Sequence, residues 1–170
     1  MKITINSIAL AIIILLLASC DRPPVLQEAQ IAQSAPTFSL KDNQGITWNL
    51  ANLKSKVTIV HFWATWCPPC RQEMPLLQEY FTSMKEEKIQ ILTIAYRDDP
   101  SAVKMFVKNA GWTMPVLFDP ESNTGRNYSL TGVPETFIID KNGLLRERFI
   151  GPVEWDDQKI RQRIMEYIKE

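Results

Sequence analysis

Two stretches of the chain are apolar and rich in β-branched residues over almost their whole length. They are Val57–Trp63 ("VTIVHFW") and Ile89–Tyr96 ("IQILTIAY"). Apolar runs of this length, bounded by polar residues, predict strands that are buried on both faces of a sheet. Shorter runs next to turn residues predict further strands at 35–40, 46–50, 115–118, 135–140 and 144–151.

In three other segments the apolar residues recur three or four positions apart, with charged residues on the opposite side. This spacing predicts amphipathic helices. One helix is expected to start at Cys67, one to span 99–112 and one to follow Asp156. Strands that alternate with helices and end in a hairpin predict an α/β fold with a central mixed sheet.

The N-terminus differs from the rest of the chain. Met1-Lys2 precedes an unbroken apolar run, "IALAIIILLLA", which is shorter than the ~20 residues that span a bilayer and suits the core of a signal peptide. The run ends in "LASC", which resembles a bacterial lipobox with Cys20 as the lipidated residue. We predict a lipoprotein signal peptide at 1–19, a tether at 20–34 and one domain at 35–170. The alternative is an ordinary signal peptide, or an uncleaved anchor, with a chance cysteine.

Composition changes this picture little. The chain is 45% hydrophobic and 22% charged, which fits one globular domain with an ordinary core. Lys+Arg and Asp+Glu are equal at 19 each, and no long basic run is present. We therefore expect no nucleic-acid partner.

Two of the three cysteines lie in "WCPPC", where a strand gives way to a helix. The free N–H groups and the dipole at a helix N-terminus favour a thiolate on Cys67, and Cys70, one turn later, is expected to lie deeper. This arrangement predicts a redox couple in which Cys67 attacks and Cys70 resolves. A structural disulfide is one alternative, but so short a loop constrains the unfolded chain little. A zinc site is another, but it needs about four ligands, and the chain has one histidine.

Several stretches resemble the TlpA/ResA/DsbE-type extracytoplasmic thiol–disulfide oxidoreductases. They are "FWATWCPPC", Pro75 shortly after it, "GVPETFIID" and "GPVEW". The resemblance covers 35–170 and implies a thioredoxin fold, with a central mixed β-sheet flanked by helices and an N-terminal β-hairpin extension. It also implies disulfide exchange through Cys67 and Cys70 as a redox-active disulfide, with no cofactor and no metal.

The same resemblance implies roles for other residues. Pro134 matches the family's cis-proline, and Val133 before it faces the cysteines and pairs with the substrate chain. Glu73 matches an acidic residue implicated in proton handling, with a solvated helix carboxylate as the alternative. Trp66 is expected to pack beside Cys67 and shape access to it, with core packing as the alternative. Trp66, Val133 and Pro134 are therefore the predicted substrate-binding residues.

His61, the lone histidine, departs from the family pattern, in which Asp or Asn holds this position. Alternation along the strand places it on the same face as 57, 59 and 63, under the helix and close to Cys70. A neutral imidazole there would be able to take the Cys70 proton during resolution, so we include His61 among the candidate catalytic residues. The alternative is a core histidine that is hydrogen-bonded to backbone.

The sequence thus predicts a thiol–disulfide oxidoreductase that reduces disulfides in exported proteins, with apocytochrome c as a candidate substrate. We expect a monomer on the periplasmic side, held by the lipid on Cys20. Asp21 directly after it resembles an inner-membrane retention signal, so the inner membrane is favoured. The resemblance implies a transmembrane electron donor of DsbD or CcdA type.

Two other functions are weighed against this one. "APTFSL" is shared with peroxiredoxins, which makes a thiol peroxidase an alternative, but their pattern places Thr three residues before Cys and Thr65 is two before Cys67. A copper chaperone of the Sco type needs a wider cysteine pair and a distant histidine, and this chain has only His61.

Overall fold

The computed structural model describes residues 31–84 and 88–170. The predicted signal peptide, Cys20 and most of the predicted tether lie outside these residues. The last part of the tether hydrogen-bonds to the domain, since the Ala32 N–H donates to the Leu145 carbonyl (2.7 Å) and the Leu145 N–H donates to the Gln33 carbonyl (2.8 Å). Within the described ranges, no helix is long and apolar enough to cross a membrane.

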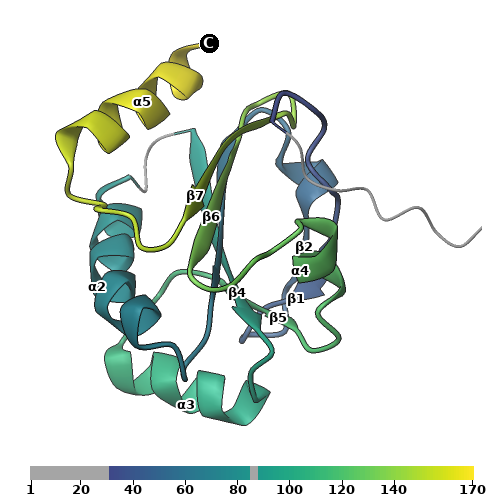
Figure 1. The fold of residues 1–170 in the computed structure, drawn as a ribbon, viewed down its shortest axis with the longest axis vertical. Helices are drawn as coiled ribbons and strands as arrows, with labels where there is room; N and C mark the ends of the chain where they lie inside the picture. The colour runs from purple at the N-terminus through teal and green to yellow at the C-terminus, as the bar shows by residue number, and fades with distance from the viewer. Residues whose placement is uncertain (1–30, 85–87) are drawn as a thin grey trace, which may run out of the picture.

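A five-stranded mixed sheet forms the centre of the molecule (Figure 1). Its order is β5 (Val116–Asp119), β4 (Ile89–Tyr96), β3 (Val57–Trp63), β6 (Glu135–Ile139) and β7 (Leu145–Ile150). The pairs β3–β4 and β4–β5 are parallel, whereas β3–β6 and β6–β7 are antiparallel. All residues of β3 are buried, which explains why its sequence is apolar at all positions but Thr58 and His61. The predicted bounds of β3 and β4 are confirmed.

Three helices cover one face of the sheet: α2 (Pro68–Ser83), α3 (Pro100–Ala110) and α5 (Gln158–Lys169). Local capping sets their ends. The Asp99 side chain accepts the Ala102 N–H at the start of α3, and Gly111 ends it with a φ of 67° that glycine adopts without strain. At the start of α5, the Asp157 side chain accepts the Lys159 N–H. The three predicted helices are confirmed.

Shorter elements lie against the other face. The N-terminal strands β1 (Ser39–Lys41) and β2 (Thr47–Asn49) pair antiparallel as a separate sheet, which confirms the hairpin extension with shorter strands than predicted. A bridge between Asp42 and Leu117 fastens this hairpin to the edge of β5. The sequence did not predict the 3-10 helix η1 (Leu50–Leu53) or the short helix α4 (Asn123–Asn127).

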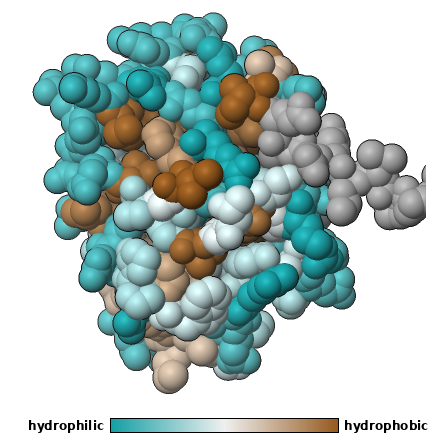
Figure 2. All heavy atoms as spheres, in the orientation of Figure 1, coloured by the Kyte–Doolittle hydropathy of each residue, from teal (hydrophilic) through white to brown (hydrophobic). Residues whose placement is uncertain are grey.

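The sheet separates two apolar cores. The helix-side core contains Val57, Ile59 and Trp63 of β3 together with both cysteines of the pair. The loop-side core contains Val60 and Phe62 of the same strand, which confirms the alternation expected along it. On the face shown in Figure 2, hydrophobic residues gather over the middle, where Figure 1 shows β6 and β7.

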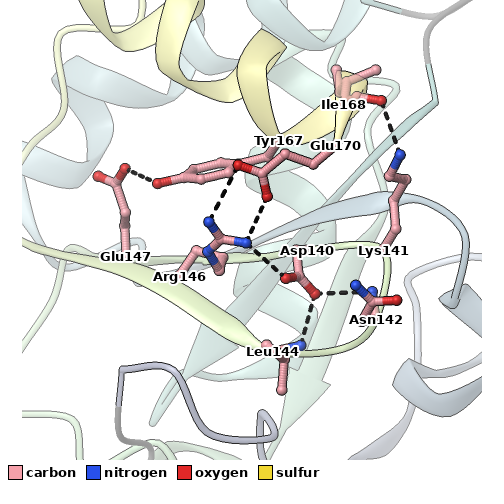
Figure 3. A network of polar contacts seen from close by, with 9 residues as sticks. All are labelled: Asp140, Lys141, Asn142, Leu144, Arg146, Glu147, Tyr167, Ile168 and Glu170. Carbon is pink, nitrogen blue, oxygen red and sulfur yellow. Dashed lines mark hydrogen bonds and ion pairs between the residues drawn. The ribbon is translucent and has the colours of Figure 1, made fainter.

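A polar network fastens α5 to β7 and to the β6–β7 turn (Figure 3). Arg146 on β7 donates to the Asp140 carboxylate (3.0 Å) and to the Glu170 carboxylate (2.7 Å). The Tyr167 hydroxyl donates to Glu147 at 2.6 Å. Because α5 is held in this way, the segment at 151–157 that leads into it has a fixed place beside α2.

Candidate active site

The two cysteines lie where β3 ends and α2 begins, and they are joined by a disulfide. Cys67 is the N-cap of α2, and its sulfur accepts the Cys70 N–H at 3.2 Å. The cap satisfies one of the free N–H groups of the first turn and would stabilise a thiolate on Cys67 in the reduced form. Cys70 is fully buried, as expected. Cys67 is 3% exposed, so in the oxidised protein it is less accessible than predicted.

The loop before β6 approaches the outer cysteine. The Val133–Pro134 peptide bond is cis, as the resemblance implied. The Val133 carbonyl oxygen lies 3.5 Å from the Cys67 sulfur, so that a substrate sulfur reaching Cys67 would lie beside the Val133 backbone. Pro134 is buried and Val133 half-buried. The structure thus brings Cys67, Cys70 and Val133 together.

A buried ion pair holds this loop in place. Glu135 is fully buried and pairs with Arg148 of β7 at 3.0 Å. Its other oxygen accepts the backbone N–H of Thr131 at 2.9 Å and also the Thr131 hydroxyl. Arg148 further donates to the Ser129 carbonyl at 2.8 Å. Sequence reasoning missed these contacts, because nothing in the sequence pairs Glu135 with a residue on the next strand.

Beside the cysteines, a groove of about 660 Å³ opens on the surface. Trp66 forms part of its wall and is 57% exposed, so core packing of this side chain is wrong. The Trp66 indole N–H donates to the Arg97 carbonyl at 3.1 Å, which holds the ring against the Arg97 backbone. The remaining lining comes from Tyr96, Arg97, Gly125, Arg126 and residues 129–133. Whether Trp66 controls access to Cys67 stays a prediction.

His61 is fully buried on the face of β3 that α2 covers, as predicted. Its Nδ1 is hydrogen-bonded to the Thr136 hydroxyl at 2.9 Å, so its partner is a side chain rather than backbone. Burial lowers the pKa of His61 from 6.5 to about 3, and the ring is therefore neutral near neutral pH. Trp155 meets the ring edge-on, with ring centroids 6.5 Å apart.

Glu73 is 3% exposed, so the alternative of a solvated helix carboxylate is wrong. Its Oε1 accepts the Val153 N–H at 3.1 Å and the Trp155 indole N–H at 2.8 Å, and lies 3.9 Å from His61 Nδ1. Its Oε2 has no hydrogen-bond partner among the described residues. Burial raises the pKa of Glu73 to about 7, with a smaller contribution from Glu154, although the two hydrogen bonds oppose the rise.

The site therefore has an outer and an inner part. The outer part is a disulfide next to Val133, which also lines the groove, and this suits exchange with another protein. The inner part is a buried carboxyl that titrates near neutrality beside a neutral imidazole, which suits proton transfer. Sequence reasoning missed Trp155 and Thr136, the partners that orient these two groups. The only signal for Trp155 was its place in "GPVEW".

Comparisons with known proteins agree with this geometry. The model of the AhpC/TSA family matches residues 31–148. The thiol-disulfide oxidoreductase ResA of a Bacillus cereus strain is 36% identical over 125 residues, which are 74% of this chain and 72% of that protein. A thiol:disulfide interchange protein of the thioredoxin family from Chlorobium tepidum TLS has a similar structure, with a TM-score of 0.72 and 29% identity over 82% of this chain and 98% of that one. The exposed lipoprotein thioredoxin Etrx1 of Streptococcus pneumoniae matches with a TM-score of 0.69 and 27% identity, over 77% of this chain and 99% of that one.

Proposed function

The chain belongs to the AhpC/TSA family and is a thiol–disulfide oxidoreductase with a thioredoxin fold; we propose that it reduces disulfides in exported proteins. The observation that carries the proposal is the Cys67–Cys70 disulfide, which lies at the start of a helix with its outer sulfur against the cis-proline loop. A substrate strand running along that loop would present its sulfur to Cys67.

The exchange would proceed in two steps that balance. The Cys67 thiolate attacks one sulfur of the substrate disulfide, forms a mixed disulfide and releases the other sulfur, which takes up a proton. Cys70 then loses its proton and attacks Cys67 Sγ, which restores the Cys67–Cys70 disulfide and releases the second substrate thiol. Two electrons and two protons pass in total from the cysteine pair to the substrate.

The buried carboxyl is the better candidate for taking the Cys70 proton. Glu73 titrates near pH 7, so it alternates readily between acid and base, whereas the low pKa of His61 makes the imidazole a weak base. In this proposal His61 acts by filling the space beside Glu73 with a neutral polar ring. His61→Ala would then slow release of the mixed disulfide less than Glu73→Gln does.

The electrons must be replaced from a dithiol outside the chain. A transmembrane dithiol protein of DsbD or CcdA type is the donor we propose, and apocytochrome c, whose haem-attachment cysteines must be reduced, is the candidate substrate. We also propose that a lipid on Cys20 holds the domain at the periplasmic side of the inner membrane. The match to an exposed lipoprotein thioredoxin supports the lipid anchor. Cys20→Ala should move the chain from the membrane fraction to the soluble fraction.

The decisive test uses oxidised apocytochrome c and the reduced protein, with thiols counted by alkylation and mass shift. The wild type should reduce the apocytochrome disulfide, and Cys70→Ser should stop at a mixed disulfide through Cys67. Cys67→Ser, which keeps the inner thiol, is the matched control and should form no adduct. Failure to reduce the apocytochrome disulfide would contradict the proposal. Oxidation of the reduced cysteine pair by hydrogen peroxide faster than by the apocytochrome disulfide would also contradict it and would favour a peroxidase.

A further inference from the structure

The groove beside Cys67 carries a net positive charge, whereas the chain as a whole carries none. Lys+Arg and Asp+Glu balance at 19 each over the whole sequence. Among the described residues that line the groove, two are arginines, Arg97 and Arg126, and none is acidic. Both arginines are exposed. The groove is therefore a local positive site on a neutral protein.

Both guanidinium groups contact neighbouring residues in the free protein. Arg97 has a left-handed backbone, with φ at 49°, and its guanidinium carbon lies 5.2 Å from the centre of the Tyr96 ring. Arg126 donates to the Glu121 carbonyl at 2.9 Å and to the Asn123 side chain. A guanidinium has five N–H donors, so each of these groups keeps donors for a further acceptor.

Acidic side chains that adjoin groove residues are hydrogen-bonded to other groups. The Glu121 carboxylate, whose own backbone carbonyl accepts from Arg126, accepts the Asn123 side-chain N–H at 2.9 Å. Asp98 follows Arg97 in the chain, but one of its oxygens accepts the Thr65 N–H and the other accepts the Thr65 hydroxyl and the Asp99 N–H. Glu135 is buried in its pair with Arg148. Within residues 31–84 and 88–170, no acidic side chain lines the groove beside the two arginines.

The groove is also continuous with the reacting sulfur. Its floor is the loop at 129–133, and the last residue of this loop, Val133, places its carbonyl 3.5 Å from Cys67 Sγ. An extended chain advances about 3.3 Å per residue. A peptide whose cysteine meets Cys67 would therefore carry its neighbouring side chains past Trp66 and the arginines.

We propose that Arg97 and Arg126 select substrates, and that the groove takes an extended segment of the target protein with a carboxylate side chain within a few residues of the reacting cysteine. The inference rests on the proposed function, since it names the kind of segment that this site reduces. Planar guanidinium groups match carboxylates by paired hydrogen bonds, and Trp66 offers a flat surface against which the segment packs. A haem-attachment segment would be a good substrate if carboxylates flank its cysteines.

The test uses the reduced protein and short peptides, each with one cysteine joined by a disulfide to a chromogenic aromatic thiol whose release is followed by absorbance. A single glutamate is placed two, three or four residues to either side of the cysteine, and each peptide is matched by one with glutamine there. At the best position, the wild type should reduce the glutamate peptide with a kcat/KM about two- to fivefold higher than that for its glutamine partner. The gain should lie in KM and shrink in about 0.5 M salt.

The variants locate the source of this preference. Arg97→Gln combined with Arg126→Gln should abolish the preference, so that the glutamate and glutamine peptides are reduced with the same kcat/KM, and the two Arg→Lys substitutions should keep part of it. Lys169→Gln removes one charge from an exposed position on α5 outside the groove and should keep all of it. Thermal unfolding of each variant checks that the fold is intact.

Three outcomes would overturn the inference. If the wild type reduces both peptides of every pair equally, the groove does not select for carboxylates, although the proposed function stands. If the preference survives in the double glutamine variant, the arginines are not its source. If the wild type reduces neither peptide, the proposed function fails first and the inference fails with it.

Discussion

Replacing Glu73 with glutamine should change the pH dependence of stability, because this buried carboxyl is easier to protonate in the folded protein than in the unfolded chain. Its pKa rises from 4.5 to about 7. The folded state thus binds more protons than the unfolded state between these values, so the free energy of unfolding falls as pH rises through this window. Glutamine has a similar shape and does not ionise, so the variant lacks this fall.

The expected magnitude follows from the size of the pKa change. One pKa unit corresponds to about 1.4 kcal/mol, so ionisation of Glu73 should destabilise the folded protein by about 3 kcal/mol. The glutamine amide also places an N–H group at the position of the unpartnered Oε2, which has a cost of its own. That cost does not depend on pH, and it cancels when two pH values are compared.

Urea denaturation of the oxidised protein at about pH 4.5 and about pH 8.5 measures this difference. Relative to wild type, Glu73→Gln should gain about 3 kcal/mol of unfolding free energy between the acidic and the alkaline condition. Glu79→Gln, an exposed position on the same helix, is the matched control and should show no pH-dependent gain. A difference between wild type and Glu73→Gln that stays constant with pH, or that grows toward acid, would refute the reasoning.

Two further substitutions probe the surroundings of the site. Gly125→Ala should lower the free energy of unfolding by about 1–3 kcal/mol, because a Cβ there would overlap the Tyr96 ring. Gly132→Ala, with open space around it, should change the free energy of unfolding by less than about 0.5 kcal/mol in the same urea titration. Equal effects at the two glycines would show that the close approach of Tyr96 to Gly125 does not set the cost of the substitution. Asp140→Asn should lower the free energy of unfolding by about 1–2 kcal/mol near neutral pH. Burial alone would raise the pKa of Asp140, but hydrogen bonds from the turn N–H groups and from Arg146 outweigh it and lower the pKa. The Asp140 carboxylate stabilises the folded protein fully above the ordinary Asp pKa, and this stabilisation is lost as pH falls through the lowered pKa. Denaturation curves of wild type and variant that stay apart in acid would contradict this assignment.

The elements that the sequence predicted well are those with strong local signals. The strand β3 has a nearly continuous apolar run, and α3 has Asp99 at its start and Gly111 at its end, so their bounds follow from residues within or next to them. The short helix α4 has no such signal. Its N-cap, Ser122, has a φ of 59° and makes no side-chain capping bond, and five residues are too few to show a helical period.

The same distinction applies to the site. The positions of the two cysteines follow from the spacing of the motif and from the strand-to-helix junction around it. The burial of Glu73 does not, because its partners Val153 and Trp155 come 80 and 82 positions later in the chain. The positive groove was missed for a similar reason, since Arg97 and Arg126 follow different strands and meet only in the folded protein.

The two cores on either side of the sheet have an evolutionary consequence. The thiol chemistry belongs to the helix-side core, where the cysteines and Trp155 pack together. The groove borders the loop-side core, where Tyr96 and Leu130 pack, and Val133 touches both. If the groove selects substrates as proposed, mutations at groove residues other than Val133 would retune substrate choice from the side of the sheet opposite the cysteine pair. On this view, new substrate specificity can be evolved or engineered on the same fold by changing one groove residue at a time.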